Sequence, residues 1–464
     1  MKFIGRQREL AAFAAFFANE QANLALVYGR RRIGKSVLIR HALGISACRY
    51  IFLECQQTSA LDNVRNLAKL GSDRLGLPGI SADTLEELLS FLAGQALDEP
   101  LIVVLDEYPY LRDLLKGCDS ILQAFLDRWK GRSKLKLILC GSYIDVMKGV
   151  LEYQSPLYGR TSLVIALGPL DYFEASEFYP DASNEDKVRY FSIFGGVPYY
   201  NRLIDPYLDV RGNILRLLKF DAAILSNEIG MFLRAELSKL NNANMVLNEI
   251  AQGTEKYSDI LAKTSVKTSP SLADILMRLI SMGLLEKTVP INDEGNQKRA
   301  RYQIADPLAN FYYRYVFKHS SSLQVLNEND FYEYFVKDDF EARNVPKAFE
   351  KICSSFLIRR NKAGLIKPPF LKIGRYYYDL PKEKKNGEFD VVTLDPVGYA
   401  FYEVKFRNKP LSLAQIEAEI SQVKASPLKA ERFGFFSRSG FSEEAAARKD
   451  LILYTLDDLY AAFP

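Results

Sequence analysis

Short, unbroken apolar runs recur along residues 1–170, and stretches with the spacing of amphipathic helices separate them. Such runs are typical of parallel strands buried on both faces, because a strand with one wet face alternates apolar and polar residues. Their alternation with helical stretches, such as 85–97 and 121–129, predicts a doubly wound α/β sheet with its ligand site at the strands' carboxyl ends. The predicted strands are 24–28, 50–53, 101–105, 136–140 and 163–167.

The pattern changes downstream of residue 240. Three segments with helical spacing precede two strand-like segments, and a polar turn at 293–296 separates those strands. Three helices followed by a hairpin are the pattern of a winged-helix domain. The five segments are 245–250, 257–261, 272–280, 283–289 and 301–304.

The last third of the chain has a pattern of its own. A helical stretch at 347–353 is followed by segments at 387–392 and 399–406, which are rich in aromatic and β-branched residues. That composition is typical of strands. A further α/β domain is therefore predicted after the hairpin.

The first strand leads into a phosphate-binding motif. Its residues are Gly29-Arg30-Arg31-Arg32-Ile33-Gly34-Lys35-Ser36, which match G-x(4)-G-K-[ST]. The glycines let the backbone curl so that its N–H groups and the next helix N-terminus face an anion. Lys35 would reach the β- and γ-phosphates of ATP, and the Ser36 hydroxyl would ligate Mg²⁺. The alternative is a glycine-rich turn with a solvated lysine, but the strand–loop–helix context favours the phosphate loop.

Polar side chains follow the ends of two further predicted strands. Asp106 and Glu107 follow 101–105, and two carboxylates at the end of an apolar strand are costly unless they meet a cation or solvent. Asp106 would hold the Mg²⁺ shell, and Glu107 would polarise the attacking water. Ser142 follows 136–140, where it is either a γ-phosphate sensor or an ordinary helix N-cap. Together with the phosphate loop, these residues predict a P-loop ATPase.

Composition narrows the remaining classes. With 464 residues, 48% of them apolar and 25% charged, the chain is typical of a soluble protein with several domains. No stretch approaches the roughly 20 apolar residues of a membrane span, and the charged start carries no secretory signal. Scattered cysteines indicate reduced thiols, so we expect a cytoplasmic protein without a membrane partner. The only histidines, His41 and His319, sit in no motif, which argues against a zinc site or a Ser-His-Asp triad.

Four separated motifs resemble those of archaeal and bacterial P-loop ATPases related to the AAA+ and STAND groups. The segment 3–10 resembles the family's "hxGRxxEL", and 29–36 is similar to its arginine-rich Walker A. The segment 155–160 resembles its "PLYGR" motif. The segment 194–200 resembles the "GGxP" start of its helical lid.

The resemblance implies roles for single residues. The segment around Ile4 and Gly5 would line the adenine pocket, and Arg160 would be a γ-phosphate sensor or finger, in cis or in trans. Such an arginine lets a neighbouring domain sense hydrolysis, because its partner charge disappears. The alternative for Arg160 is a structural arginine. Nucleotide binding is assigned to Ile4, Gly5, Arg6, Gly29, Arg30, Arg31, Arg32, Ile33, Gly34, Lys35 and Ser36; catalysis to Lys35, Asp106, Glu107, Ser142 and Arg160; and metal binding to Ser36 and Asp106.

The predicted winged helix has two possible roles. Helix-turn-helix relatives bind duplex DNA by such a third helix. Here its exposed face offers Ser271, Asp274 and Arg278, with Lys263 and Lys267 in the preceding turn. That is little positive charge for a phosphate backbone, which favours packing against the ATPase. The resemblance implies the same role, since the winged helix of related ATPases often acts as a nucleotide-sensing lid.

The last domain resembles the PD-(D/E)xK nucleases. Asp390 and the pair Glu403 and Lys405 match that core, in which two carboxylates hold Mg²⁺ and the lysine positions or activates water. Glu403 and Lys405 share a strand face, and Glu350 would match the fold's helical carboxylate. A plain surface ion pair is the alternative, and nuclease activity stays open because no proline directly precedes Asp390. Basic residues that would track phosphates are Arg359, Arg360, Lys382, Lys384, Lys385, Arg407 and Lys409.

The predicted organisation is an ATPase core at 1–170, a helical lid at 171–240, a winged helix at 241–310 and an α/β restriction-endonuclease-like domain at 311–464. We expect a switch that binds and hydrolyses Mg-ATP and whose last domain binds or processes DNA. The alternative is a signalling or scaffold ATPase whose last domain is a degenerate nuclease fold used for protein contacts. Assembly into a homo-oligomer stays open.

Overall fold

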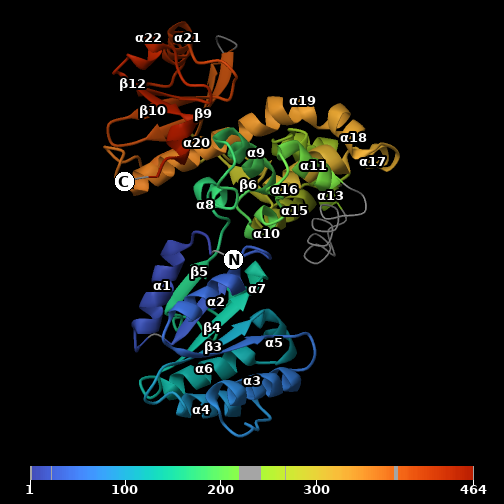
Figure 1. The fold of residues 1–464 in the computed structure, drawn as a ribbon, viewed down its shortest axis with the longest axis vertical. Helices are drawn as coiled ribbons and strands as arrows, with labels where there is room; N and C mark the ends of the chain where they lie inside the picture. Colours follow the sequence, from blue (N-terminus) through green and yellow to red (C-terminus); the bar gives the residue numbers. More distant parts are fainter. Residues whose placement is uncertain (1–2, 22, 219–241, 267, 381–384, 463–464) are drawn as a thin grey trace. The chain divides into compact units, whose positions relative to one another are not determined.

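The computed structural model of the chain describes residues 3–21, 23–218, 242–266, 268–380 and 385–462 (Figure 1). The chain divides into two compact units, Met1–Leu170 with Val197–Tyr199 and Asp171–Gly196 with Tyr200–Pro464. The boundaries of the four predicted domains stay a prediction. Much of the predicted lid after residue 218 lies outside the described residues, as do Lys267, Lys382 and Lys384.

The first unit alternates strands and helices, and each of the five predicted strands is present with ends shifted by at most one residue. Helix starts follow local capping; for example, Ser59 and Thr84 each accept a hydrogen bond from a backbone N–H in the first turn of the helix that follows. The elements are α1 (Gln7–Ala18), β1 (Leu24–Tyr28), α2 (Lys35–Ile45), β2 (Arg49–Glu54), α3 (Ala60–Leu75), α4 (Leu85–Gly94), β3 (Leu101–Asp106), α5 (Tyr108–Leu114), α6 (Cys118–Trp129), β4 (Leu135–Gly141), α7 (Ile144–Gly149) and β5 (Leu163–Ala166).

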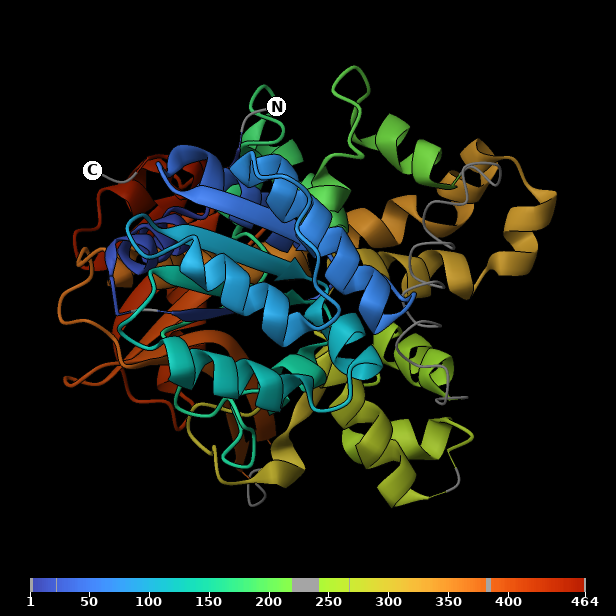
Figure 2. The ribbon, with the colours of Figure 1, turned by 90° about the horizontal axis from the view of Figure 1, so that it is seen from below.

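The sheet of the first unit is parallel, with strand order β2-β3-β4-β1-β5. In Figure 2 its strands, coloured blue to teal, lie behind helices of the same unit. Strand β4 lies between β1 and β3, so that Tyr28 is opposite Gly141, and Leu105 is opposite Leu139. Parallel strands end at one edge of a sheet, so the loops after β1, β4 and β3 are neighbours.

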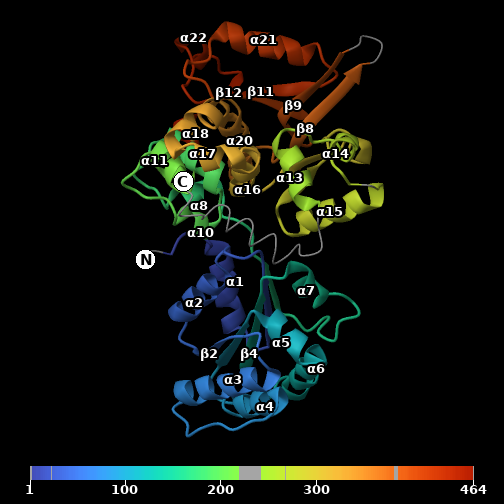
Figure 3. The ribbon, with the colours of Figure 1, turned by 90° about the vertical axis from the view of Figure 1, so that its right-hand side faces the viewer.

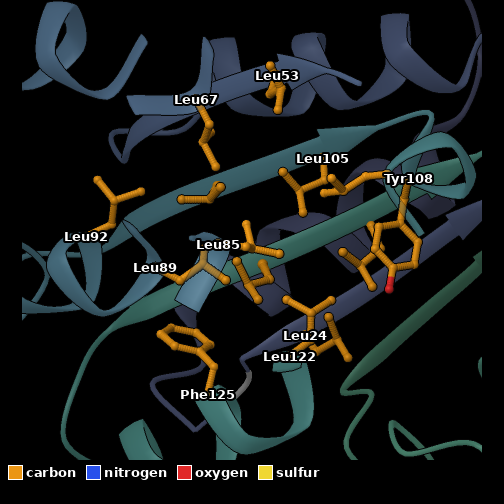
Figure 4. Packing of buried hydrophobic residues seen from close by; sticks show 14 of the residues in the cluster. Leu24, Leu53, Leu67, Leu85, Leu89, Leu92, Leu105, Tyr108, Leu122 and Phe125 are labelled. Atoms are coloured by element: carbon orange, nitrogen blue, oxygen red, sulfur yellow. The ribbon is translucent and has the colours of Figure 1, made fainter. Parts of the chain in front are cut away.

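A single large cluster of apolar side chains joins this sheet to α3, α4 and α6 (Figure 4). It includes Leu24 and Leu105 from the strands, Leu67 from α3, Leu89 from α4 and Leu122 from α6, all without solvent exposure. Full burial of one leucine side chain contributes about 1.5–3 kcal/mol to folding. Such a densely packed frame holds the loops at the strand ends in place.

The second unit begins with helices and a hairpin. Three helices followed by a two-stranded antiparallel hairpin occupy 243–304, in the predicted order. The short helix α10 (Pro198–Asn201) lies where the chain passes between the two units' sequence ranges. The elements are α8 (Tyr172–Ser176), α9 (Asn184–Phe194), α11 (Val210–Leu218), α13 (Ala243–Ala251), α14 (Tyr257–Lys263), α15 (Ser269–Ser281), β6 (Leu285–Thr288), η1 (Gln297–Arg299) and β7 (Arg301–Ile304).

A second sheet ends the chain, with strand order β12-β11-β10-β9-β8. Its β8, β9 and β10 are antiparallel, whereas β10, β11 and β12 are parallel. Figures 1 and 3 show this sheet between α20 on one face and α21 with α22 on the other. The elements are α16 (Pro307–Phe311), η2 (Tyr312–Phe317), α17 (Ser320–Val325), α18 (Glu328–Phe335), α19 (Lys337–Asp339), η3 (Phe340–Asn344), α20 (Val345–Lys362), β8 (Lys372–Leu380), β9 (Lys385–Leu394), β10 (Tyr399–Lys405), α21 (Leu413–Lys424), β11 (Ala430–Ser437), α22 (Glu443–Ala446), β12 (Leu451–Thr455) and α23 (Leu456–Tyr460).

The loop of the β6–β7 hairpin is part of the C-terminal sheet's packing. The side chain of Ile291 is buried in the same apolar cluster as Tyr376 and Phe389. The Ile291 N–H donates to the Arg375 carbonyl at 2.7 Å. The Asn292 amide nitrogen donates to the Tyr377 carbonyl at 2.8 Å. The hairpin and the C-terminal sheet are therefore held together by a backbone hydrogen bond, by the side-chain amide of Asn292 and by a shared core.

Candidate active site

The phosphate loop follows β1 and is shaped by its glycines. A Cβ at Gly29 would lie 2.3 Å from the Leu167 carbonyl oxygen, so only glycine fits there. Gly34 has φ 92°, a left-handed conformation that glycine adopts at little cost. Arg32 adopts a left-handed conformation as well, with φ 68°. These positions bend the chain back on itself between the strand and α2.

Lys35 is held inside this bend. Its ammonium donates to the carbonyls of Gly29 and Arg30 at 2.9 and 3.1 Å, and to Ser142 Oγ at 2.8 Å. Burial lowers the pKa of Lys35, whereas the nearby carboxylates of Asp106 and Glu107 act in the opposite direction. Because it is only 5% exposed and surrounded by acceptors, the ammonium is placed to meet an anion in the loop.

Glu107 is linked to Lys35 through Ser142. The Ser142 hydroxyl donates to one carboxylate oxygen of Glu107 at 2.6 Å, and the Ser142 backbone N–H donates to the other at 3.3 Å. Glu107 itself has φ 52°, an uncommon conformation for a residue with a side chain. The tertiary structure thus joins the ends of β1, β4 and β3 in one hydrogen-bonded chain.

Asp106 and Ser36 form the donor set expected for a magnesium ion. Asp106 is 4% exposed, and its carboxylate accepts the backbone N–H of Glu107 at 3.1 Å. Ser36 lies in the first turn of α2, where its hydroxyl makes no hydrogen bond to any described residue. Carboxylate and hydroxyl oxygens are the hard ligands that Mg²⁺ prefers, so these residues fit the metal.

The N-terminal segment is tied to the phosphate loop. The Arg6 guanidinium donates to the Gly168 carbonyl at 2.6 Å and to the Ile33 carbonyl at 3.5 Å. Ile4 and Gly5 precede it in irregular structure, and Gly5 has φ 65°. The role of Ile4 and Gly5 in adenine binding stays a prediction.

Tyr110 and Tyr143 contact the phosphate loop but were not predicted from the sequence. Arg31 donates to the hydroxyls of Tyr110 and Tyr143 at 3.0 and 3.3 Å. The Arg32 guanidinium lies 4.3 Å from the centre of the Tyr199 ring, as a cation–π pair. Tyr143 directly follows Ser142, so its position near a predicted strand end could have identified it. The sequence around Tyr110 contains no comparable pattern.

Arg160 is held away from the hydrogen-bonded chain of Lys35, Ser142 and Glu107. Both its Nε and Nη2 donate to the Asp127 carboxylate at 2.9 Å. Its Nη1 donates to the carbonyls of Pro156 and Tyr158. This pairing agrees with the structural alternative for Arg160, and its role as a sensor or finger stays a prediction.

The second candidate site lies on α20, β9 and β10. Glu350, Asp390, Glu403 and Lys405 line one pocket of about 370 Å³. Lys405 Nζ lies 2.5 Å from Glu403 and 2.9 Å from Glu419, so the two side chains on one face of β10 form an ion pair. No group of three or more His, Cys, Asp or Glu side chains among the described residues is arranged to hold a metal ion.

Two carboxyl groups of this pocket, those of Glu350 and Glu403, have raised pKa values. Burial, together with the neighbouring Asp390, raises the pKa of Glu350 to about 8. Burial also raises the pKa of Glu403, although the Lys405 ammonium opposes the shift. A cation that enters this pocket would relieve both groups.

Arg375 contacts Asp390 of this site and was missed by the sequence analysis. It lies where the pairing of β8 with β9 is irregular, and its Nε is 3.8 Å from Asp390. Its other contacts are to Glu388 at 3.1 Å and Glu255 at 3.6 Å. A lone arginine in an aromatic strand carries no motif, so only the tertiary structure reveals it.

The third helix of the three-helix segment keeps little free charge. On its exposed face Arg278 pairs with Asp274 at 3.2 Å.

Every helix among the described residues is too short or too polar to cross a bilayer.

Two family descriptions match parts of the chain. Residues 3–202 match an ATPase domain predominantly from Archaea. Residues 312–420 match a family of archaeal and bacterial proteins of unknown function. The first range contains the phosphate loop and both strand-end sites, and the second contains Glu350, Asp390, Glu403 and Lys405.

Two whole proteins are similar to longer parts of the chain. An uncharacterized protein of Methanocaldococcus jannaschii is 27% identical over 462 residues, which is 98% of this chain and 99% of that protein. The Walker-type ATPase of Pyrococcus abyssi has a TM-score of 0.51 and 20% identity, covering 67% of this chain and 96% of its own. That second likeness shows a shared fold. The chain thus combines a match to a predominantly archaeal ATPase domain at 3–202 with a match to the second family at 312–420.

Proposed function

We propose that the first unit binds and hydrolyses Mg-ATP at the loops after β1, β3 and β4. The observation that carries the proposal is the hydrogen-bonded chain from Lys35 through Ser142 to Glu107. It brings a phosphate-binding ammonium and a candidate general base into one connected site.

Each residue has a separate task in this proposal. The backbone N–H groups of the loop and the Lys35 ammonium would hold the phosphates. Ser36 and Asp106 would hold Mg²⁺, which when bound neutralises charge on the phosphates. Glu107, oriented by the Ser142 hydroxyl and N–H, would accept a proton from the attacking water.

Two substitutions test this assignment. Lys35→Ala is expected to abolish ATP binding, because the loop loses its buried cation. Glu107→Gln is expected to keep binding but slow turnover by about a hundredfold or more. The measurements are titration with a fluorescent ATP analogue and phosphate release, with the exposed Lys69→Ala as a control in the same unit. Unchanged hydrolysis in Glu107→Gln would remove Glu107 as the base.

We further propose that the ATPase acts as a switch for a C-terminal domain that binds or processes nucleic acid. The supporting observation is the pocket that gathers Glu350, Asp390, Glu403 and Lys405 from three elements. Magnesium is often held by one or two carboxylates together with substrate phosphates, which fits this donor set. Asp390 and Glu403 would then be the ligands, with Lys405 positioning a water.

Nuclease assays separate this proposal from the signalling or scaffold alternative. Linear and supercoiled DNA are incubated with wild type and Asp390→Ala, in Mg²⁺ or Mn²⁺. Metal-dependent cleavage that is lost in the variant supports DNA processing. The absence of both cleavage and salt-sensitive DNA binding would favour the scaffold, in which the domain contacts other proteins.

A further inference from the structure

A pocket of about 200 Å³ lies between the β6–β7 hairpin and the strands β8 and β9 of the second unit. Its basic residues come from separate elements: Lys256 precedes α14, Lys298 and Arg299 lie in η1, Arg301 begins β7, and Arg375 lies in β8. Of the described residues that line it, only Glu388 is acidic. The pocket wall therefore carries an excess of positive charge.

The three arginines of the pocket have carboxylate partners, whereas the two lysines have none among the described residues: Arg299 lies 3.0 Å from Asp293, and Arg375 contacts Glu255 and Asp390. Arg375 and Arg301 share Glu388, at 3.1 and 3.9 Å. Lys256 and Lys298 are exposed, and neither forms an ion pair with a described residue. Two lysines without ion-pair partners lie beside two arginines that share one carboxylate. This arrangement favours an anionic ligand.

The arrangement of the cations favours a polymer over a small anion. Dedicated sites for a single phosphate commonly use backbone N–H groups at a loop or a helix N-terminus. This pocket offers long lysine and arginine side chains from several elements, which is how proteins follow a nucleic-acid backbone. The hairpin that supplies Lys298 and Arg299 is joined to β8 by the Ile291 and Asn292 contacts, which hold its loop beside the pocket.

Arg375 connects this pocket with the carboxylate pocket. Its guanidinium contacts both Glu388 and Asp390, which lie two residues apart on β9 and so share one face. A nucleic-acid strand carries successive phosphates and can therefore contact both pockets, whereas one small anion occupies only one of them. Arg375 thus links the two pockets.

We propose that the pocket formed by Lys256, Lys298, Arg299, Arg301 and Arg375 binds backbone phosphates of a nucleic-acid strand and leads that strand to the Asp390–Glu403 pocket. This inference rests on the proposed nucleic-acid role of the C-terminal domain. It adds the site that binds the strand, which is distinct from the site proposed to process it.

Charge reversal at the two unpaired lysines tests the proposal. The full-length double variant Lys256→Glu/Lys298→Glu changes two exposed side chains and so should leave the fold intact. Binding is measured by fluorescence anisotropy with a labelled 20-nucleotide single strand and its duplex, in EDTA at several salt concentrations. We expect affinity for the single strand to fall about tenfold at moderate salt, and the slope of its salt dependence to fall by about 1.4.

A matched control keeps the net charge equal. Lys429→Glu/Lys449→Glu also reverses two exposed lysines of the second unit, at positions that line neither pocket. This control should bind the oligonucleotide like wild type. Equal weakening in both lysine variants would overturn the pocket assignment, since net charge alone would explain it.

The outcomes also separate this inference from the function on which it rests. Wild-type binding that is insensitive to the pocket variant overturns the inference alone. Absence of oligonucleotide binding by wild type overturns both. Displacement of the oligonucleotide by millimolar inorganic phosphate from wild type, but not from the pocket variant, would assign the pocket to a small anion instead.

Discussion

The Ser142 hydroxyl lies 2.6 Å from a carboxylate oxygen of Glu107, and the Ser142 backbone N–H contacts the other oxygen. Ser142 directly follows the central strand β4, and Glu107 directly follows the neighbouring strand β3. The same hydroxyl oxygen accepts a hydrogen bond from the Lys35 ammonium at 2.8 Å. One small side chain therefore connects the residue that would bind phosphate with the residue that would activate water.

Ser142→Ala tests this connection. The substitution removes the bonds to Lys35 and to one Glu107 oxygen, while the backbone N–H remains. We expect turnover to fall on the order of ten- to a hundredfold, because the carboxylate is less well positioned, with a much smaller change in ATP affinity. Phosphate release and equilibrium nucleotide binding measure the two effects. Ser142→Thr keeps the hydroxyl and should recover most of the activity; full activity of Ser142→Ala would mean that Glu107 is oriented without it.

Gly29→Ala tests the shape of the phosphate loop. The new methyl group would lie 2.3 Å from the Leu167 carbonyl oxygen, a backbone atom that cannot easily move. We expect a loss of about 1–3 kcal/mol in the free energy of unfolding, with weaker nucleotide binding. Gly44→Ala on α2 is the matched control, because nothing lies within 4 Å of its Cβ position and alanine favours a helix. A variant at Gly29 as stable as this control would show that the loop shifts freely.

Arg160 can be tested against its partner. Asp127 and Arg160 form a largely exposed pair, so either alanine variant should change stability by no more than about 1 kcal/mol. If Arg160 senses the γ-phosphate, Arg160→Ala lowers ATP turnover by about tenfold or more, while Asp127→Ala does not. We expect this difference in a steady-state assay. Equal turnover in the two variants would leave Arg160 with a structural role only.

The raised pKa of Glu350 predicts that the stability of the second unit depends on pH in the absence of metal. Its pKa is about 8 in the folded protein against 4.5 ordinarily, mainly because it is buried. The folded state therefore binds the proton more tightly than the unfolded state. This contribution to stability is complete below about pH 4.5 and is lost as the pH rises through 8.

Glu350→Gln removes this dependence, since glutamine stays neutral. Scanning calorimetry in EDTA should find the variant close to wild type at pH 5 and more stable at pH 8.5, on the order of 2–4 kcal/mol. Added Mg²⁺ should narrow the gap at pH 8.5 if the pocket binds the ion. Parallel pH profiles for wild type and variant would show that Glu350 titrates as an ordinary surface carboxylate.

The sequence by itself determined the nucleotide site's main parts. Gly29 to Ser36 form a contiguous motif, and a loop that follows a buried strand needs no distant residue to take its shape. The strand ends at Asp106 and Ser142 were also readable, because unbroken apolar runs identify buried parallel strands. The two-residue spacing of Glu403 and Lys405 likewise placed them on one face.

Only the tertiary structure decided which of these elements meet. The position of β4 between β1 and β3 puts Ser142 beside Lys35 and Glu107, and strand order depends on long-range packing that local periodicity does not encode. The same holds for Arg160 on Asp127 and for Ile291, whose hairpin completes the core of a sheet more than eighty residues away in the chain. Arg375 lies at the irregularity in the pairing of β8 with β9 and contacts both Glu388 and Asp390, and these contacts arise only when the sheet forms.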